Sequence, residues 1–87
     1  MEKFEIGMLA KSKAGHDKGT VYVILSSDEE YVYLADGRLK TTGSTKKKKK
    51  KHVQLICRKY DVSDADDVAI KRILKEYKEK EGKKEEA

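Results

Sequence analysis

The stretch TVYVILSSDEEYVYLADG, residues 20–37, contains the two most strongly β-prone runs of the chain. In the first run, Val21 and Val23 fall on one side of an extended backbone. Tyr22 and Ile24 fall on the other side, and both sets are β-branched or aromatic. The second run, YVYLA, has the same character, and the polar SSDEE between them predicts a turn. The stretch therefore predicts two adjacent strands.

Two further runs outside this stretch have the same period. IGMLAK spans residues 6–11, and HVQLIC spans residues 52–57. The latter places Val53, Leu55 and Cys57 on one face, so Cys57 is expected to be a small apolar core residue. Four such runs separated by glycine-containing turns predict a small antiparallel β unit, closed into a strongly bent barrel that buries its apolar sides.

The segment that follows YVYLA is predicted from its turn residues and its charge. Asp36-Gly37 predicts a two-residue type I′ hairpin, with a short strand through Leu39. The segment TTGSTKKKKKK then brings six consecutive lysines, Lys46–Lys51. Because like charges repel, we expect a mobile loop there unless an anion holds it.

The last part of the chain changes to a helical period. Its apolar stripe at i, i+3, i+4 and i+7 consists of Ile70, Ile73, Leu74 and Tyr77. Ser63 and Asp66 resemble a capping box, and Gly82 is expected to end the helix. The sequence thus predicts a barrel over residues 1–60, and a C-terminal helix with a frayed tail over residues 61–87. We expect the stripe to pack on the barrel rather than on a partner.

Composition limits the class of protein. The chain has 87 residues, of which 37% are hydrophobic and 43% charged, which allows one small domain. Residues 1–60 carry fourteen Lys and Arg against seven Asp and Glu, whereas residues 61–87 carry seven against nine. A basic first part predicts a polyanionic partner. The single cysteine excludes an internal disulfide, and no apolar run approaches the roughly 20 residues of a membrane span, so we expect a cytoplasmic protein.

The loop AGHDKG, residues 14–19, shows how a cationic site could be built. Gly15 and Gly19 allow backbone conformations that other residues avoid, and Asp17 can accept hydrogen bonds from the following amides. The cations that would project from this turn are Lys13, His16 and Lys18. Exposed amides and cations suit a phosphate backbone, although an ordinary polar turn has the same residues.

Three elements together resemble the KOW-motif ribosomal proteins. They are SKAGHDKG at residues 12–19, Asp36-Gly37-Arg38 followed by Lys40, and the lysine run that ends in Lys51-His52-Val53. Their order and spacing are similar to the fourteen-e type of archaeal and eukaryotic large subunits, and to its small bacterial relatives. The likeness covers about residues 4–57. The chain departs from this pattern in having His16 in place of arginine, no proline before the lysines and a more uniform lysine run, which favours binding by charge over binding by shape.

The resemblance implies an SH3-like barrel that binds RNA, commonly ribosomal RNA, as part of a ribonucleoprotein in translation. Ribosomal proteins would be further partners, and the protein would act as a monomer without a cofactor, a metal or a membrane. The residues expected to bind RNA are Lys13, Gly15, His16, Lys18, Gly19, Arg38, Lys40, Lys46, Lys47, Lys48, Lys49, Lys50, Lys51 and His52.

Other interpretations stay open. Tyr22, Tyr31 and Tyr33 could stack on unpaired bases if they face outward, or fill the barrel. An SH3-like protein-interaction module that uses the tyrosines and the helical stripe is the first alternative, and a KOW factor that binds DNA or a transcription complex is the second. We do not expect an enzyme, because the sequence has no recognisable nucleophile motif or metal-ligand spacing.

Overall fold

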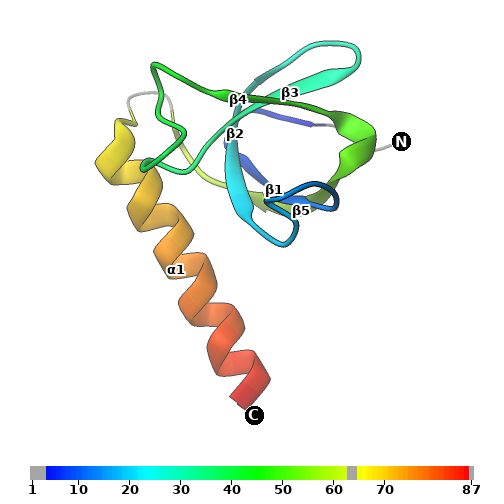
Figure 1. Cartoon of the computed structure of the whole chain (residues 1–87). Coiled ribbons are helices and arrows are strands. Elements are labelled where there is room, and N and C mark those ends of the chain that lie inside the picture. The colour runs from blue at the N-terminus through cyan, green and yellow to red at the C-terminus, as the bar shows by residue number, and fades with distance from the viewer. Residues whose placement is uncertain (1–3, 63–64, 87) are drawn as a thin grey trace.

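The two runs that open the sequence analysis form an antiparallel strand pair. The computed structural model describes residues 4–62 and 65–86, without the side chains of Cys57 and of residues 81–86 (Figure 1). In the turn between the two strands, Asp28 Oδ1 accepts hydrogen bonds from the amides of Glu30 and Tyr31, at 3.0 Å and 2.8 Å. An aspartate that bonds the amides after it closes the turn without needing a glycine.

Five strands make one antiparallel sheet in the order β4-β3-β2-β1-β5. The strands are β1 (Met8–Ser12), β2 (Val21–Ser27), β3 (Tyr31–Ala35), β4 (Lys46–Lys49) and β5 (Val53–Lys59). Register shifts between Met8 and Leu9 and between Ile24 and Ser26 mark the places where the sheet bends. The sheet curls on itself and a helix lies against its outside (Figure 1). The predicted fold class is confirmed as a mainly β, SH3-like antiparallel barrel with a C-terminal helix. The predicted closure of the barrel is wrong in the described residues, because β4 and β5 end the sheet and do not pair with each other.

Apolar side chains cover both faces of this sheet. The inner cluster, inside the curl, consists of Met8, Ala10, Tyr22, Ile24, Val32, Leu34 and Val53. The outer cluster, between sheet and helix, consists of Leu9, Val21, Val23, Ala35, Ile70 and Leu74. Val21–Ile24 of β2 therefore alternate between the two clusters as predicted, and both faces of β2 are buried along these four residues. The prediction for Cys57 lies outside the described side chains.

The helix α1 (Asp67–Glu86) packs on the barrel through the predicted stripe. Ile70 is fully buried and Leu74 nearly so, while Ile73 and Tyr77 are partly buried against the same cluster. Within the part of the chain that the structure describes, no helix is both long enough and apolar enough to cross a membrane.

The ends of α1 differ in part from the prediction. Asp66 Oδ1 accepts the amide of Ala69 at 2.9 Å and so caps the helix, whereas Ser63 lies outside the described residues. The prediction that Gly82 ends the helix is wrong, because α1 continues to Glu86, so the tail after Gly82 belongs to the helix.

The lysine segment is not the mobile loop that its charge predicts. Lys46–Lys49 form β4, which pairs with β3, and Lys50–His52 form a 3₁₀ helix. β3 offers an unpaired row of backbone groups at its edge, and the lysine backbone satisfies that row regardless of side-chain charge. Lysines on β4, an edge strand of the sheet, also hinder further strand addition.

The Asp36-Gly37 turn is not the predicted hairpin either. Gly37 has a φ of 78°, but no described residue other than glycine has a positive φ, so the two positive angles of a type I′ turn are missing. Asp36 Oδ1 instead accepts the amides of Arg38 and Lys40 at 2.8 Å and 3.0 Å. No strand passes through Leu39, a residue that is 85% exposed in the loop before β4.

Candidate functional site

The AGHDKG loop is a fixed turn at the start of β2. The amide of Gly19 donates to the carbonyl of Ser12 at 2.9 Å, and the amide of Thr20 donates to the carbonyl of Asp17 at 2.9 Å. Gly15 and Gly19 have φ angles of 86° and 92°, which confirms why glycine stands at both positions. The turn exposes the side chains of Lys13, His16 and Lys18.

The Asp17 carboxylate joins this loop to the lysine segment. Its Oδ1 accepts Ser12 Oγ at 2.9 Å and Lys48 Nζ at 3.0 Å. Its Oδ2 accepts the Tyr22 hydroxyl at 2.8 Å and lies 3.2 Å from Lys46 Nζ. The prediction that this carboxylate bonds the following amides is therefore wrong, because side chains from three other elements use it.

The surroundings of Asp17 keep it ionised. Burial by itself raises its pKa, but the hydrogen bonds from Tyr22, Lys48, Ser12 and Lys46 outweigh burial and hold the pKa well below its usual range. Burial and the hydrogen bond to Asp17 raise the pKa of Tyr22, with a smaller contribution from the charge of Asp36. Tyr22 thus stays protonated as a donor, and it is not free to stack on a base.

The inner face of β4 carries Lys46 and Lys48. Lys46 lies opposite Leu34 in the ladder and Lys48 opposite Val32, and directly opposed residues share a face. Both partners belong to the inner cluster, so Lys46 and Lys48 lie on the side of β4 that faces this cluster. The Lys48 side chain is only 11% exposed and also donates to the Ala14 carbonyl at 3.0 Å. These two lysines bind the protein's own loop.

The outer face of the same strand carries Lys47 and Lys49. They lie opposite Tyr33 and Tyr31, whose rings are partly exposed. Lys47 Nζ lies 4.3 Å from the centroid of the Tyr31 ring. Outside the inner cluster, therefore, two aromatic side chains and two cations share one surface, here called the outer β3–β4 face.

The 3₁₀ helix continues the lysine run beside both the turn of β3 and the glycine loop. The amide of Lys50 donates to the Glu30 carbonyl at 2.8 Å, and the amide of Lys13 donates to the His52 carbonyl at 2.8 Å. A shallow hollow of about 330 Å³ is lined by Glu30, Lys49, Lys50 and Lys51. The backbone thus ties the two cationic segments together at a second point.

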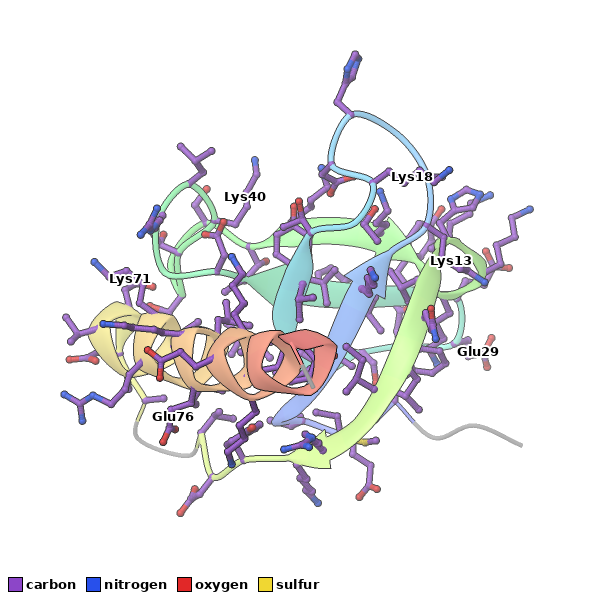
Figure 2. The ribbon with its side chains drawn as sticks, turned by 90° about the horizontal axis from the view of Figure 1, so that it is seen from below. Lys13, Lys18, Glu29, Lys40, Lys71 and Glu76 are labelled. Carbon is purple, nitrogen blue, oxygen red and sulfur yellow. The ribbon has the colours of Figure 1, made fainter. Side chains whose placement is uncertain are left out.

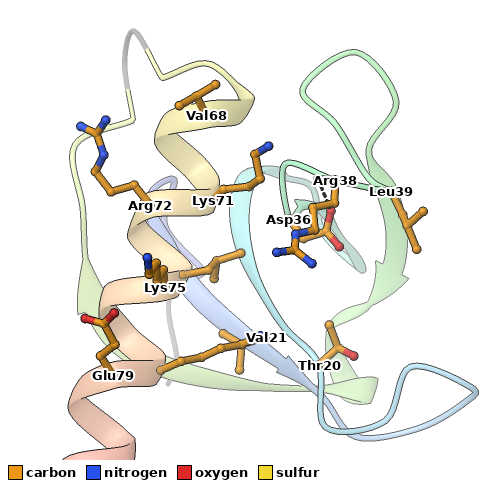
Figure 3. A pocket seen from close by; sticks show the side chains of 12 residues that line it. Thr20, Val21, Asp36, Arg38, Leu39, Val68, Lys71, Arg72, Lys75 and Glu79 are labelled. Atoms are coloured by element: carbon orange, nitrogen blue, oxygen red, sulfur yellow. Dashed lines mark hydrogen bonds between the residues drawn. The ribbon is translucent and has the colours of Figure 1, made fainter.

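The Asp36–Lys40 loop lies near the glycine loop, but Arg38 faces the helix. Thr20, which directly follows the glycine loop, lines the same hollow as Asp36 and Arg38. Figure 2 shows Lys18 and Lys40 projecting on the same side of the molecule. Arg38, however, lines a groove between this loop and α1 (Figure 3).

Sequence reasoning missed the cations on the other wall of that groove. Lys71, Lys75 and Lys78 follow i, i+4, i+7 spacing, next to the apolar stripe that was identified. The same helical period that revealed the buried stripe could have revealed this one. The charge balance of the tail hid it, because that tail is acidic overall.

The predicted site residues therefore divide into three groups. The exposed ones are Lys13, Gly15, His16, Lys18, Gly19, Arg38, Lys47 and Lys51. The partly exposed ones, which make no ion pair with another described residue, are Lys40, Lys49, Lys50 and His52. Lys46 and Lys48 pair with Asp17. In the residues that the structure describes, no group of three or more His, Cys, Asp or Glu side chains is placed to hold a metal ion.

Neither the comparison with protein-family models nor the search of curated proteins finds a match for this chain, so its likeness to the KOW ribosomal proteins rests on the three sequence elements alone.

Proposed function

We propose that this protein binds RNA as a cytoplasmic, ribosome-associated factor without catalytic activity. The cations that contact the phosphate backbone are those left free by Asp17 in the glycine loop and the lysine segment. They are Lys13, Lys18, Lys47, Lys49 and Lys51. Lys46 and Lys48 have a structural role in this proposal.

The observation that carries the proposal is the junction at Asp17. Lys48 reaches this carboxylate from 31 residues away along the chain, and this contact places the glycine loop beside the lysine segment. The remaining cations of both segments stay exposed or partly exposed. A fixed arrangement of unpaired lysines attracts a polyanion and releases its counterions on binding.

The outer β3–β4 face favours unpaired RNA over a duplex. Sequence-tolerant binding of single strands combines cations that follow the backbone with aromatic rings on which bases stack. Tyr31 and Tyr33 supply partly exposed rings, directly opposite Lys49 and Lys47. The resemblance to ribosomal proteins supports ribosomal RNA as the natural ligand.

The test is a fluorescence anisotropy titration of a labelled oligouridylate of about 12 nucleotides at several salt concentrations. With about five phosphate contacts on a single strand, log affinity is expected to fall against log salt with a slope near −3.5. The double variant Lys47→Gln, Lys49→Gln is expected to weaken binding roughly tenfold and to reduce the slope by about 1.4.

The matched control is Lys59→Gln with Lys80→Gln. It removes the same charge from two exposed lysines outside the lysine segment and the glycine loop, and is expected to change affinity less than about twofold. Equal losses in the two double variants would contradict the proposed site. Tighter binding of duplex DNA than of oligouridylate or duplex RNA would contradict RNA as the ligand and favour a DNA-binding factor.

A further inference from the structure

The groove between α1 and the Asp36–Lys40 loop is a second cationic surface, distinct from the outer β3–β4 face. It has a volume of about 840 Å³. Its basic side chains are Arg38, Lys71, Arg72, Lys75 and Lys78, against the acidic Asp36 and Glu79. Figure 3 shows Lys71 extending from the helix toward the loop that carries Arg38.

Two contacts hold the walls of this groove together. The amide of Thr42 donates to Asp67 Oδ1 at 2.8 Å, which fixes the loop to the first turn of α1. A Cβ on Gly37 would collide with the Asp67 carbonyl and the Lys71 side chain, so the loop backbone touches the helix there. Because these contacts already fix both walls, the binding of a ligand would cost little entropy for ordering the walls.

The groove cations are available to a ligand. Among the described side chains, ion pairs are made by Lys46, Lys48 and Lys59, and none involves a cation of the groove. Asp36 uses one carboxylate oxygen for two backbone amides of its own loop. Arg38 on the loop and Lys71 on the helix are unpaired positive charges on opposite walls of the groove, so an acidic ligand is the complementary one.

Apolar side chains at the groove identify the kind of acidic ligand. Leu39 is 85% exposed and Val68 is 57% exposed, and both line the groove. None of its lining residues is aromatic, so the rings on which unpaired bases usually stack are missing. We propose that this groove binds an acidic, leucine-containing segment of a partner protein, and that the binding is independent of the RNA site.

The test is a titration of two labelled peptides of about 15 residues, one repeating Leu-Glu-Glu and one of glutamate only. The Leu-Glu-Glu peptide is expected to bind at least threefold more tightly than polyglutamate. Lys71→Gln with Lys75→Gln is expected to weaken the peptide at least fivefold, while Lys59→Gln with Lys80→Gln changes it less than twofold. Leu39→Ser is expected to weaken the Leu-Glu-Glu peptide about threefold and to leave polyglutamate unchanged.

Three results would overturn the proposal. The first is equal weakening by the groove pair and the control pair, which would mean binding by net charge alone. The second is indifference of the Leu-Glu-Glu peptide to Leu39→Ser. The third is an at least fivefold loss of oligouridylate affinity in the groove variant, which would make the groove a nucleic-acid surface. The proposed RNA site uses other residues than the groove. The double variant Lys47→Gln, Lys49→Gln is therefore expected to keep its affinity for the Leu-Glu-Glu peptide even if it loses oligouridylate binding.

Discussion

The inner and outer faces of β4 each carry two lysines, but the surroundings of the two faces differ. Lys46 and Lys48 point to the barrel interior and meet Asp17, whereas Lys47 and Lys49 share the outer face with Tyr31 and Tyr33. The ladder register with β3 decides which lysine belongs to which face. A run of identical lysines is therefore two different sets of residues, one for the fold and one for a ligand.

The largest expected effect is on the inner face. Asp17→Asn leaves the 11%-exposed Lys48 without its counter-charge, and is expected to lower the free energy of unfolding by about 2–4 kcal/mol. Urea denaturation measures this. Glu5→Gln is the matched control, because it breaks the exposed pair with Lys59 and should cost less than about 0.5 kcal/mol. Similar costs for the two variants would mean that the inner lysines are not structural.

The same carboxylate predicts a pH dependence of stability. The pKa of Asp17 is lower in the folded protein than in the unfolded chain, so its contribution is complete above the unfolded pKa. We expect that part of the stability to be lost as the pH falls below about 4 toward the folded pKa. Asp17→Asn should make the unfolding free energy flatter over this range, which a urea titration at several pH values checks. If Asp17→Asn leaves the slope of the unfolding free energy against pH unchanged over this range, other carboxylates determine the loss of stability in acid.

On the outer face, the expected effect is on affinity. Tyr31→Ala removes a partly exposed ring beside Lys47, and is expected to weaken oligouridylate binding about fivefold to tenfold. Tyr31→Phe keeps the ring and should bind nearly as tightly as the unmodified protein. Anisotropy titration compares the three proteins. If Tyr31→Phe binds as weakly as Tyr31→Ala, the hydroxyl and not stacking is responsible.

The smallest effect compares two tyrosine hydroxyls. Tyr22 donates to Asp17 from the inner cluster, and Tyr33 donates to Asp28 at an exposed turn. Tyr22→Phe is expected to lower the free energy of unfolding by about 1 kcal/mol, because Asp17 loses a buried donor. Tyr33→Phe should change it by a few tenths, because water replaces the lost partner. A larger cost for Tyr33→Phe, measured by thermal unfolding, would reverse the assignment of the two faces.

The fold was predictable where side-chain period decides the structure. Alternation places Val23 and Ile24 in opposite clusters, and the helical stripe places Ile70 and Leu74 against the sheet. The glycine loop was also predictable, because Gly15 and Gly19 both have positive φ angles.

The lysine strand was not predictable from local sequence. Lysine is uncommon in strands, and six charges in a row favour a solvated loop. The partner strand and the counter-charge at Asp17 both come from distant parts of the chain, and tertiary contacts outweigh local preference. For the same reason, the sequence identifies the lysines as candidate cations. It does not show that Lys46 and Lys48 face inward and pair with Asp17, whereas Lys47 and Lys49 face outward.

The most direct test of this division is NMR of the lysine ammonium groups during addition of oligouridylate. We predict that the signals of Lys47 and Lys49 shift, whereas those of Lys46 and Lys48 stay in place because Asp17 holds them. Shifts at Lys46 and Lys48 as large as those at Lys47 and Lys49 would contradict the account.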